Sequence, residues 1–135
     1  MSNRIRTLIV EDEIFVALDL ERILEDRGYD VVAIAADRQE ALAHGACCDV
    51  AFVDINLRDG PTGPEIARTL AEEHSVKIVF VTANPAQIGA SASSAICYVR
   101  KPFGEEAILA AAAMAHGEDR RNASVIQLNR PWAGD

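Results

Sequence analysis

Long hydrophobic runs are missing from this sequence. None of its apolar stretches approaches the roughly 18 consecutive residues that a membrane-spanning helix requires, so membrane insertion is not expected. Residues 1–6 lead directly into an apolar, strand-like segment and not into the apolar part of a secretory leader. These features predict a cytoplasmic protein.

Cysteine is scarce, with three residues in the whole chain. Cys47 and Cys48 are adjacent and Cys97 is distant, so the Cys-x-x-Cys and Cys/His spacings of zinc sites and redox motifs do not occur. We therefore expect reduced thiols with structural roles and no disulfide framework.

Positive charge is also in short supply. The chain has 13 lysine and arginine residues against 21 aspartate and glutamate residues, which gives a net charge of -8. Nucleic acids and anionic membranes are bound through basic surfaces, because such surfaces displace the counterions of the phosphates. The charge balance thus argues against direct nucleic-acid binding, and it favours a basic protein surface or a bound cation as the partner.

The sequence does contain enough apolar material for one core. Half of its 135 residues are hydrophobic and a quarter are charged, as in ordinary globular domains. We expect a single domain over residues 1–117 and a short, flexible tail over residues 118–135, because the tail shows no lasting periodicity.

Short β-branched runs alternate with longer helical patterns along the chain, which predicts parallel strands joined by crossover helices. Strands are expected over residues 5–10, 31–35, 50–53, 77–81 and 96–99, and helices over residues 14–27, 37–46, 64–74 and 105–116. Residues 84–94 are rich in Gly, Ser and Ala and predict a short or irregular fourth helix. The predicted fold class is α/β, with a five-stranded, doubly wound parallel sheet and helices on both faces.

Polar side chains follow the ends of four predicted strands. Glu11 and Asp12 follow the first strand, and Asp54 follows the third. Thr82 follows the fourth strand and Lys101 follows the fifth. Because the functional crevice of an open parallel sheet lies beyond the carboxyl ends of its strands, we expect these side chains to meet there.

Three carboxylates at one edge require a cation. Two like charges about 4 Å apart repel by about 4 kcal/mol at an effective dielectric constant near 20. Mg²⁺ relieves this repulsion with one or two carboxylates and a backbone carbonyl as ligands, and it leaves coordination positions for a phosphoryl oxygen. Lys101 can pair with Asp54 at rest and with a phosphoryl oxygen after transfer. The set predicts Mg²⁺-dependent phosphoryl transfer with Asp54 as the nucleophile.

Two further side chains are candidates for a response to that transfer. The hydroxyl of Thr82 can donate a hydrogen bond to the new phosphoryl group and so reposition the loop after the fourth strand. Tyr98, on the fifth strand, can then change rotamer into the vacated space, although an aromatic residue in a last strand normally just packs.

At these positions the chain resembles the receiver domains of two-component response regulators. The resemblance covers roughly residues 4–116. The residues that carry it, in order, are Glu11-Asp12, Asp54, Thr82-Ala83, Tyr98 and Lys101-Pro102-Phe103.

The resemblance implies a ligand set and a phosphoryl donor. Asp54 would receive the phosphoryl group from a phosphohistidine on a sensor histidine kinase or a phosphotransfer protein. Asp12, Asp54 and the backbone carbonyl of Asn56 would bind Mg²⁺, with Glu11 acting nearby or through a water molecule. Asn56 and Asn84 occupy positions at which members of that family tune the loss of the phosphoryl group.

The resemblance also implies a fold and an output. Thr82 and Tyr98 would form a coupled switch pair, the Lys101-Pro102 peptide bond would be cis, and the sheet would be flavodoxin-like with strand order 2-1-3-4-5. The chain is similar to single-domain members, which act by docking on a downstream protein target. Residues 83–97 are shorter than the family's usual segment, which puts its usual output face in question.

Three other functions share features with this pattern. Aspartate-nucleophile phosphatases share this topology, but they carry a second acid two residues after the nucleophile, where this chain has Asn56. A phosphorylation-independent binding module with the same fold would be suggested by loss of Asp54 or Lys101, and both are present. A flavin phosphate would be repelled by Glu11 and Asp12. We therefore expect a signalling switch and not an enzyme.

Overall fold

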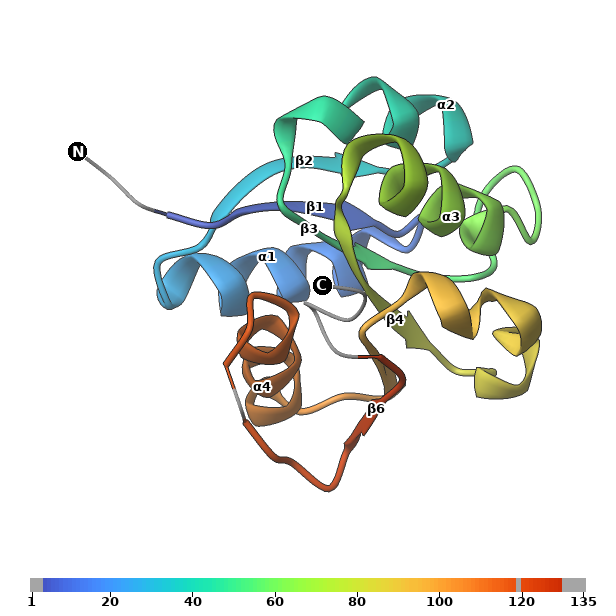
Figure 1. Ribbon diagram of the computed structural model, residues 1–135. Helices are drawn as coiled ribbons and strands as arrows, with labels where there is room; N and C mark the ends of the chain where they lie inside the picture. The colour runs from blue at the N-terminus through green and yellow to red at the C-terminus, as the bar shows by residue number, and fades with distance from the viewer. Residues whose placement is uncertain (1–3, 119, 130–135) are drawn as a thin grey trace.

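The strands of the computed structural model form one mostly parallel sheet in the order β2-β1-β3-β4-β5-β6 (Figure 1). Residues 4–118 and 120–129 are described. The strands are β1 Arg6–Val10, β2 Asp30–Ala35, β3 Val50–Val53, β4 Lys77–Thr82, β5 Cys97–Arg100 and β6 Val125–Gln127. The first five pair in parallel and β6 pairs antiparallel with β5. The predicted strand order 2-1-3-4-5 is thereby confirmed, with one strand added.

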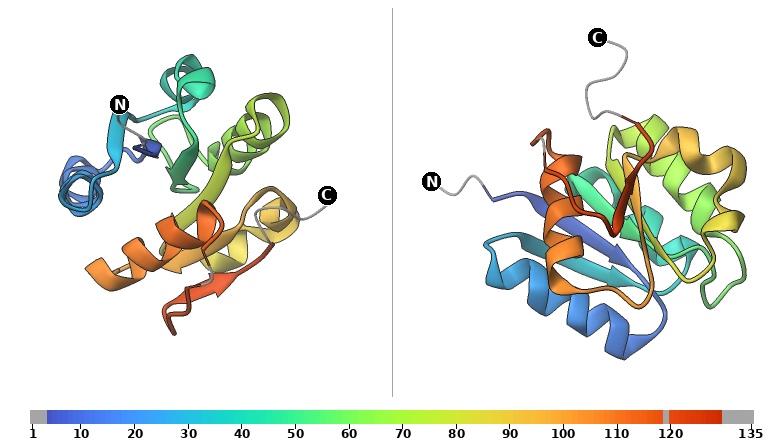
Figure 2. Two further views of the ribbon diagram at one scale, coloured as in Figure 1. Left: turned by 60° about the vertical axis from the view of Figure 1, so that its left-hand side comes forward. Right: turned by 90° about the horizontal axis from the view of Figure 1, so that it is seen from below.

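Helices cover both faces of the sheet (Figures 1 and 2). Helices α1 (Ile14–Asp26) and α4 (Glu105–Ala115) pack on one face, and α2 (Arg38–Ala43) and α3 (Gly63–His74) pack on the other. Within the described ranges, no helix has both the length and the apolar character that crossing a bilayer demands. The predicted doubly wound arrangement is confirmed.

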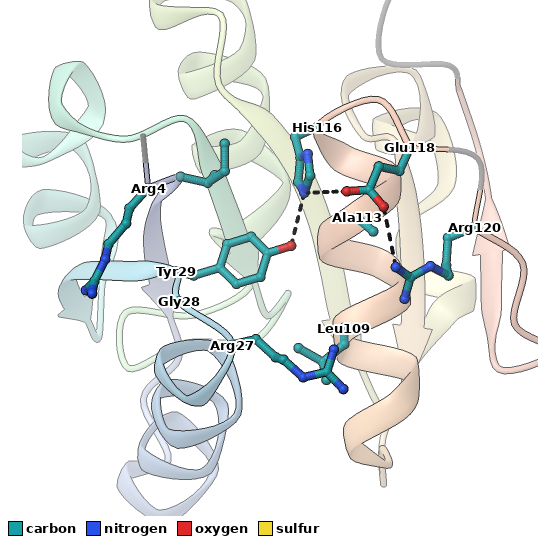
Figure 3. A pocket seen from close by; sticks show the side chains of 10 residues that line it. Arg4, Arg27, Gly28, Tyr29, Leu109, Ala113, His116, Glu118 and Arg120 are labelled. Atoms are coloured by element: carbon teal, nitrogen blue, oxygen red, sulfur yellow. Dashed lines mark hydrogen bonds and ion pairs between the residues drawn. The ribbon is translucent and has the colours of Figure 1, made fainter. Parts of the chain in front are cut away.

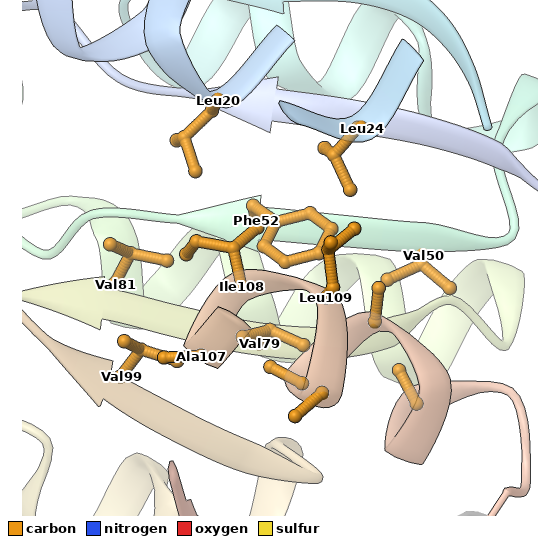
Figure 4. Close-up of a cluster of buried hydrophobic side chains, with 14 of the residues drawn as sticks. Leu20, Leu24, Val50, Phe52, Val79, Val81, Val99, Ala107, Ile108 and Leu109 are labelled. Carbon is orange, nitrogen blue, oxygen red and sulfur yellow. The ribbon is translucent and has the colours of Figure 1, made fainter. Parts of the chain in front are cut away.

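The core on the α1 side is built around Phe52, which lies on β3 between the two helices (Figure 4). Leu20 and Leu24 reach it from α1, and Ile108 and Leu109 come from α4. Residues 107–115 of α4 are all buried, mostly as alanines. A helix that is apolar all round must be enclosed, and small side chains let α4 lie close to the sheet and to its neighbours.

The connection between β4 and β5 has no α-helix. It contains two short 3₁₀ helices, η2 (Pro85–Gln87) and η3 (Gly89–Ser94), and neither has a buried residue. Small polar side chains bury too little apolar area to hold a longer amphipathic helix there. This confirms the predicted short or irregular fourth helix.

Two expectations differ from the structure. The helix expected over residues 37–46 ends at Ala43 and continues as a 3₁₀ turn over Gly45–Cys47, where Gly45 lies against α3. The tail expected to be flexible over residues 118–135 instead contains β6, which is fixed by hydrogen bonds to β5. Residues 119 and 130–135 of that predicted tail lie outside the described residues.

Candidate functional site

Four of the predicted site residues lie at the carboxyl edge of neighbouring strands. The pairing of Val10 with Val53 aligns the ends of β1 and β3, so Glu11 and Asp54 stand next to each other. Thr82 ends β4 beside Arg100, which places Lys101 directly after the matching end of β5. The structure therefore brings together the residues that the sequence places at separate strand ends.

Lys101 lies between two carboxylates. Its Nζ is 2.9 Å from Oδ2 of Asp54 and 2.7 Å from Oε1 of Glu11. The side chains of Lys101, Asp54 and Glu11 are only 14%, 10% and 1% exposed. An ammonium ion shared by two poorly hydrated carboxylates is held strongly, because water screens the attraction little at this depth.

Burial and hydrogen bonding to oppositely charged partners shift the pKa values of Glu11 and Lys101 in opposite directions. Burial raises the pKa of Glu11, although the hydrogen bonds from Lys101 and from the backbone N–H of Glu13 work against that rise. Burial also acts to lower the pKa of Lys101, but its hydrogen bonds to Asp54 and Glu11 outweigh that effect and raise it. The lysine therefore stays charged over the whole physiological range.

A cluster of three carboxylates with the geometry to hold a cation lies beside this ion pair. Carboxylate oxygens of Glu11, Asp12 and Asp54 all come within 4.8 Å of one another. Asp12 is exposed, whereas Glu11 and Asp54 are buried. Three hard oxygen donors with one face open to water fit Mg²⁺, which binds through few carboxylates and retains several waters.

The backbone fixes the direction of both buried carboxylates. Oδ1 of Asp54 accepts a hydrogen bond of 2.7 Å from the backbone N–H of Ile55. Oε2 of Glu11 accepts one of 3.1 Å from the backbone N–H of Glu13. Each carboxylate is thus held by one oxygen, and the other oxygen faces Lys101.

The chain after Asp54 turns back closely on itself. The backbone N–H of Gly63, at the start of α3, donates to the carbonyl of Ile55 at 3.0 Å. A Cβ at position 63 would overlap the backbone oxygen of Asp54 and lie 2.6 Å from the Cα of Ile55. Only glycine allows α3 to begin this close to the acceptor strand.

Thr82 and Tyr98 lie on the same face of the sheet. Thr82 is buried, and its Oγ1 accepts a hydrogen bond of 2.9 Å from the backbone N–H of Asn84. Tyr98 pairs with Phe80, two residues before Thr82 on β4, and it is half-buried against the α3-side core. The two side chains are therefore diagonal neighbours across the β4–β5 pair.

The structure adds two residues that the sequence analysis missed. Glu13 has an oxygen 4.0 Å from Nζ of Lys101, at the rim of the site. Gln87 accepts a hydrogen bond of 2.9 Å from the side-chain amide of Asn56, which joins the loop after β3 to the connection after β4. The only sequence signal for Glu13 was its position two residues after Glu11, and no sequence signal pointed to Gln87. The Lys101-Pro102 bond is cis, as the resemblance implied.

A cavity of about 410 Å³ lies at the amino end of the sheet, opposite the edge that carries Glu11, Asp12 and Asp54 (Figure 3). There the hydroxyl of Tyr29 is 3.0 Å from Nε2 of His116, and Nε2 is 3.7 Å from Glu118. Burial raises the pKa of Tyr29, so the hydroxyl keeps its proton. These contacts join the ends of α1 and α4, and we assign them a structural role.

Comparison with known proteins gives one family. The family model described as the response regulator receiver domain matches residues 7–113. The phyllosphere-induced regulator PhyR of Methylorubrum extorquens is 35% identical over 81 residues, which cover 58% of this chain and 30% of that protein. The transcriptional regulatory protein PdtaR of Mycobacterium tuberculosis is 32% identical over 117 residues, which cover 82% of this chain and 56% of that protein. The chain thus spans less than two thirds of either relative.

Solved structures give the same result. The solution structure of the Erythrobacter litoralis PhyR receiver domain has a TM-score of 0.76 at 25% identity, over 89% of this chain and 96% of that one. A CheY-like receiver domain protein from Methanospirillum hungatei has a TM-score of 0.69 at 27% identity, over 79% and 89%.

Proposed function

Because this chain belongs to the response regulator receiver domain family, we propose that it is a phosphorylation-controlled signalling switch whose acceptor is Asp54. The observation that carries the proposal is the Lys101 ammonium held between Asp54 and Glu11 beside an open carboxylate cluster. The phosphoryl donor is a phosphohistidine on a sensor histidine kinase or a phosphotransfer protein. The output is docking on a downstream protein target.

The transfer needs a nucleophile and charge stabilisation, and the residues present supply both. A carboxylate oxygen of Asp54 attacks phosphorus, a P–O bond forms, and the bond from phosphorus to the donor nitrogen breaks with its electron pair leaving on the imidazole. Lys101 stabilises the negative charge on the equatorial phosphoryl oxygens. Asp12, Asp54 and the carbonyl of Asn56, with Glu11 behind them, would hold Mg²⁺, which neutralises charge on donor and acceptor when bound.

The same residues argue against an enzyme. Asn56 occupies the position two residues after Asp54 where an aspartate-nucleophile phosphatase needs a general acid and base, and an amide does not transfer protons. Its side chain is exposed and donates to Gln87. We therefore propose a stoichiometric acceptor that at most loses its own phosphoryl group slowly.

The acceptor assignment is tested by intact mass. With Mg²⁺ and acetyl phosphate, the wild-type chain is expected to gain one phosphoryl group, and Asp54→Asn is expected to gain none. The control, Asp26→Asn, removes a carboxylate from an exposed position on α1 and should be modified like the wild type. Equal modification of Asp54→Asn, or modification unchanged by removal of Mg²⁺ with a chelator, would contradict the assignment.

A surface for the phosphoryl donor lies next to the site. On α1, Phe15 is 85% exposed, and Ile14 and Leu18 are also exposed. Phe15 lines a groove of about 760 Å³ whose other wall contains Lys101 and Pro102. Contiguous exposed apolar side chains mark protein-binding sites, and a donor seated here would reach Asp54 past Lys101. We assign this groove to the kinase or phosphotransfer protein.

If this groove binds the protein donor, a substitution in it should slow transfer from a kinase but not from a small phosphodonor. Phe15→Ala is expected to slow transfer from a histidine kinase that modifies the wild-type chain by at least about tenfold, because it removes a large apolar contact from the donor complex. Modification by acetyl phosphate should stay within about twofold, since Phe15 is an exposed side chain on α1 and is not part of the carboxylate cluster. Val32→Ala, another exposed apolar position on the far strand β2, is the matched control. Equal losses with both donors would refute the docking role.

A further inference from the structure

The outer edge of β5 is occupied by a segment of this chain. Strand β6 pairs antiparallel with β5 over three residue pairs: Cys97 with Gln127, Tyr98 with Ile126, and Val99 with Val125. Beyond β6, the backbone N–H groups of Leu128 and Asn129 both donate to the carbonyl of Ile96, at 2.7 and 3.0 Å. Residues 125–129 thus bind β5 in the manner of an added strand.

The side chain of Asn129 closes this segment like a clamp. Its Nδ2 donates to the carbonyl of Ala92 at 2.7 Å and to the carbonyl of Ala95 at 2.6 Å. Both carbonyls belong to the end of η3, just before β5. One amide therefore ties the C-terminal segment to the connection between β4 and β5.

The other end of that connection is tied to the phosphorylation edge. At that end, the backbone N–H of Asn84 donates a hydrogen bond to Oγ1 of Thr82. A second hydrogen bond, from the side-chain amide of Asn56 to Gln87, joins the connection to the loop after β3. Between the two ends, Ile88 is buried, but η2 and η3 contribute no buried residue. The 3₁₀ helix η3 also lies against α3. Because the connection contributes few buried side chains of its own, the hydrogen bonds at its two ends help to position it, and a change at one end is passed to the other.

Strand β6 is a short strand at the edge of the sheet. It has only three residues, of which Val125 is buried and Ile126 and Gln127 are exposed. Its departure would expose little apolar surface, but it would free a row of backbone donors and acceptors on β5. An open strand edge of this kind pairs readily with another extended chain.

We propose that the β5 edge is a strand-binding groove, that residues 125–129 fill it in the unphosphorylated chain, and that phosphorylation opens it to an extended segment of the downstream partner. This inference rests on the proposed function of Asp54. When the Thr82 hydroxyl turns to donate to a phosphoryl oxygen, the N–H of Asn84 loses its acceptor and the connection shifts. The carbonyls of Ala92 and Ala95 then move away from Asn129, and the clamp opens.

Residues 125–129 indicate which features a partner segment needs in order to take their place. The partner segment should be extended, run antiparallel to β5, and carry an apolar side chain at the place of the buried Val125. Another apolar residue should match Leu128, which packs against the α3-side core, and an amide should match Asn129. Backbone pairing gives such a complex its affinity, and these side chains give it selectivity.

The first test follows the release of β6 in the full chain. After treatment with acetyl phosphate and Mg²⁺, the amides of Leu128 and Asn129 are expected to exchange with deuterium at least tenfold faster than before. Intact mass of the same sample reports the phosphoryl group. Unchanged exchange in a chain that carries the phosphoryl group overturns the inference and leaves the proposed function standing. A chain that acquires no phosphoryl group rejects the proposed function instead.

The second test measures the groove directly with a fluorescent peptide of residues 122–129. The phosphorylated chain is expected to bind it at least tenfold more tightly than the unphosphorylated chain, and a peptide of scrambled order should not bind. Asn129→Ala is expected to bind it without phosphorylation, because the clamp is gone. Gln127→Ala, which alters an exposed side chain on the same strand, should behave like the wild type. Equal peptide binding by these two variants contradicts the proposed strand-binding groove, whether or not Asp54 is phosphorylated.

Discussion

Replacing Gly63 with alanine is expected to destabilise the folded chain by about 3 kcal/mol or more, because the three atoms nearest to the new methyl group all belong to the backbone. It would overlap the backbone oxygen of Asp54, and it would lie 2.6 Å from the Cα of Ile55 and 2.9 Å from the carbonyl carbon of Asp54. Side chains can rotate away from an added methyl group, but the end of β3 cannot move without disturbing its pairing with β1 and β4.

The same substitution should impair phosphorylation beyond its effect on stability. Relief of the overlap requires Asp54 or the start of α3 to shift, and a shift of Asp54 lengthens its 2.9 Å contact with Lys101. Urea unfolding followed by circular dichroism gives the stability, and intact mass after acetyl phosphate treatment gives the modification of the chain that remains folded.

Gly104→Ala is the matched control for Gly63→Ala. Nothing lies within 4 Å of a Cβ at position 104, which caps α4 with an ordinary extended backbone. Its cost should be about 1 kcal/mol or less, the usual difference between glycine and alanine at a helix cap. If Gly63→Ala unfolds at the same urea concentration as Gly104→Ala, the close approach of α3 to the acceptor strand is not essential.

The residues at the strand ends could be predicted because the core fixes their positions. Glu11 and Asp54 directly follow an apolar run, and Lys101 follows one after a single intervening residue, Arg100. Parallel pairing brings the ends of such runs to one edge. The partner of the Thr82 hydroxyl was not predictable in this way. It depends on the turn after β4, whose small side chains leave its path to hydrogen bonds that the sequence does not show.

Strand β6 could not be predicted for a related reason. Three residues are too few for an alternating pattern to stand out, and only Val125 of the three is buried. The strand forms because the β5 edge is open and because Asn129 finds two carbonyls at the end of η3. Both conditions arise only once the sheet has assembled. The local sequence pattern of residues 118–135 therefore predicts only a flexible tail.

Lys101→Met should destabilise the chain, in the absence of Mg²⁺, by about 3 kcal/mol at neutral pH, because it leaves two buried carboxylates facing each other without their shared cation. Methionine keeps most of the apolar stem of lysine, so lost packing adds little. The side chains of Glu11 and Asp54 are 1% and 10% exposed, and water cannot replace the ammonium there.

The pH dependence of this loss has a definite sign. Burial already raises the pKa of Glu11 in the presence of Lys101, and removal of the ammonium raises it further. Between the unfolded and folded pKa values of Glu11, the folded chain binds more protons than the unfolded chain, so stability falls as pH rises through that window. The variant should therefore recover part of its stability on acidification.

The wild type should show the complementary behaviour at high pH. The pKa of Lys101 is raised by its two carboxylate partners, so its contribution to stability is complete below the unfolded pKa of lysine and is lost as pH rises through the folded value. Lys101→Met has no such alkaline loss from this residue. Urea unfolding of both chains across the pH range measures the two slopes.

Two further variants separate the structural and chemical roles of Lys101. Lys77→Met, on β4 at the opposite end of the sheet, should change stability by about 0.5 kcal/mol or less. Adding Glu11→Gln to Lys101→Met removes one of the two facing charges and should restore most of the lost stability. Phosphorylation by acetyl phosphate should stay at least tenfold slower in this double variant, because no ammonium remains to stabilise the equatorial oxygens. Recovery of both properties together would show that Lys101 serves only to hold the carboxylates in place.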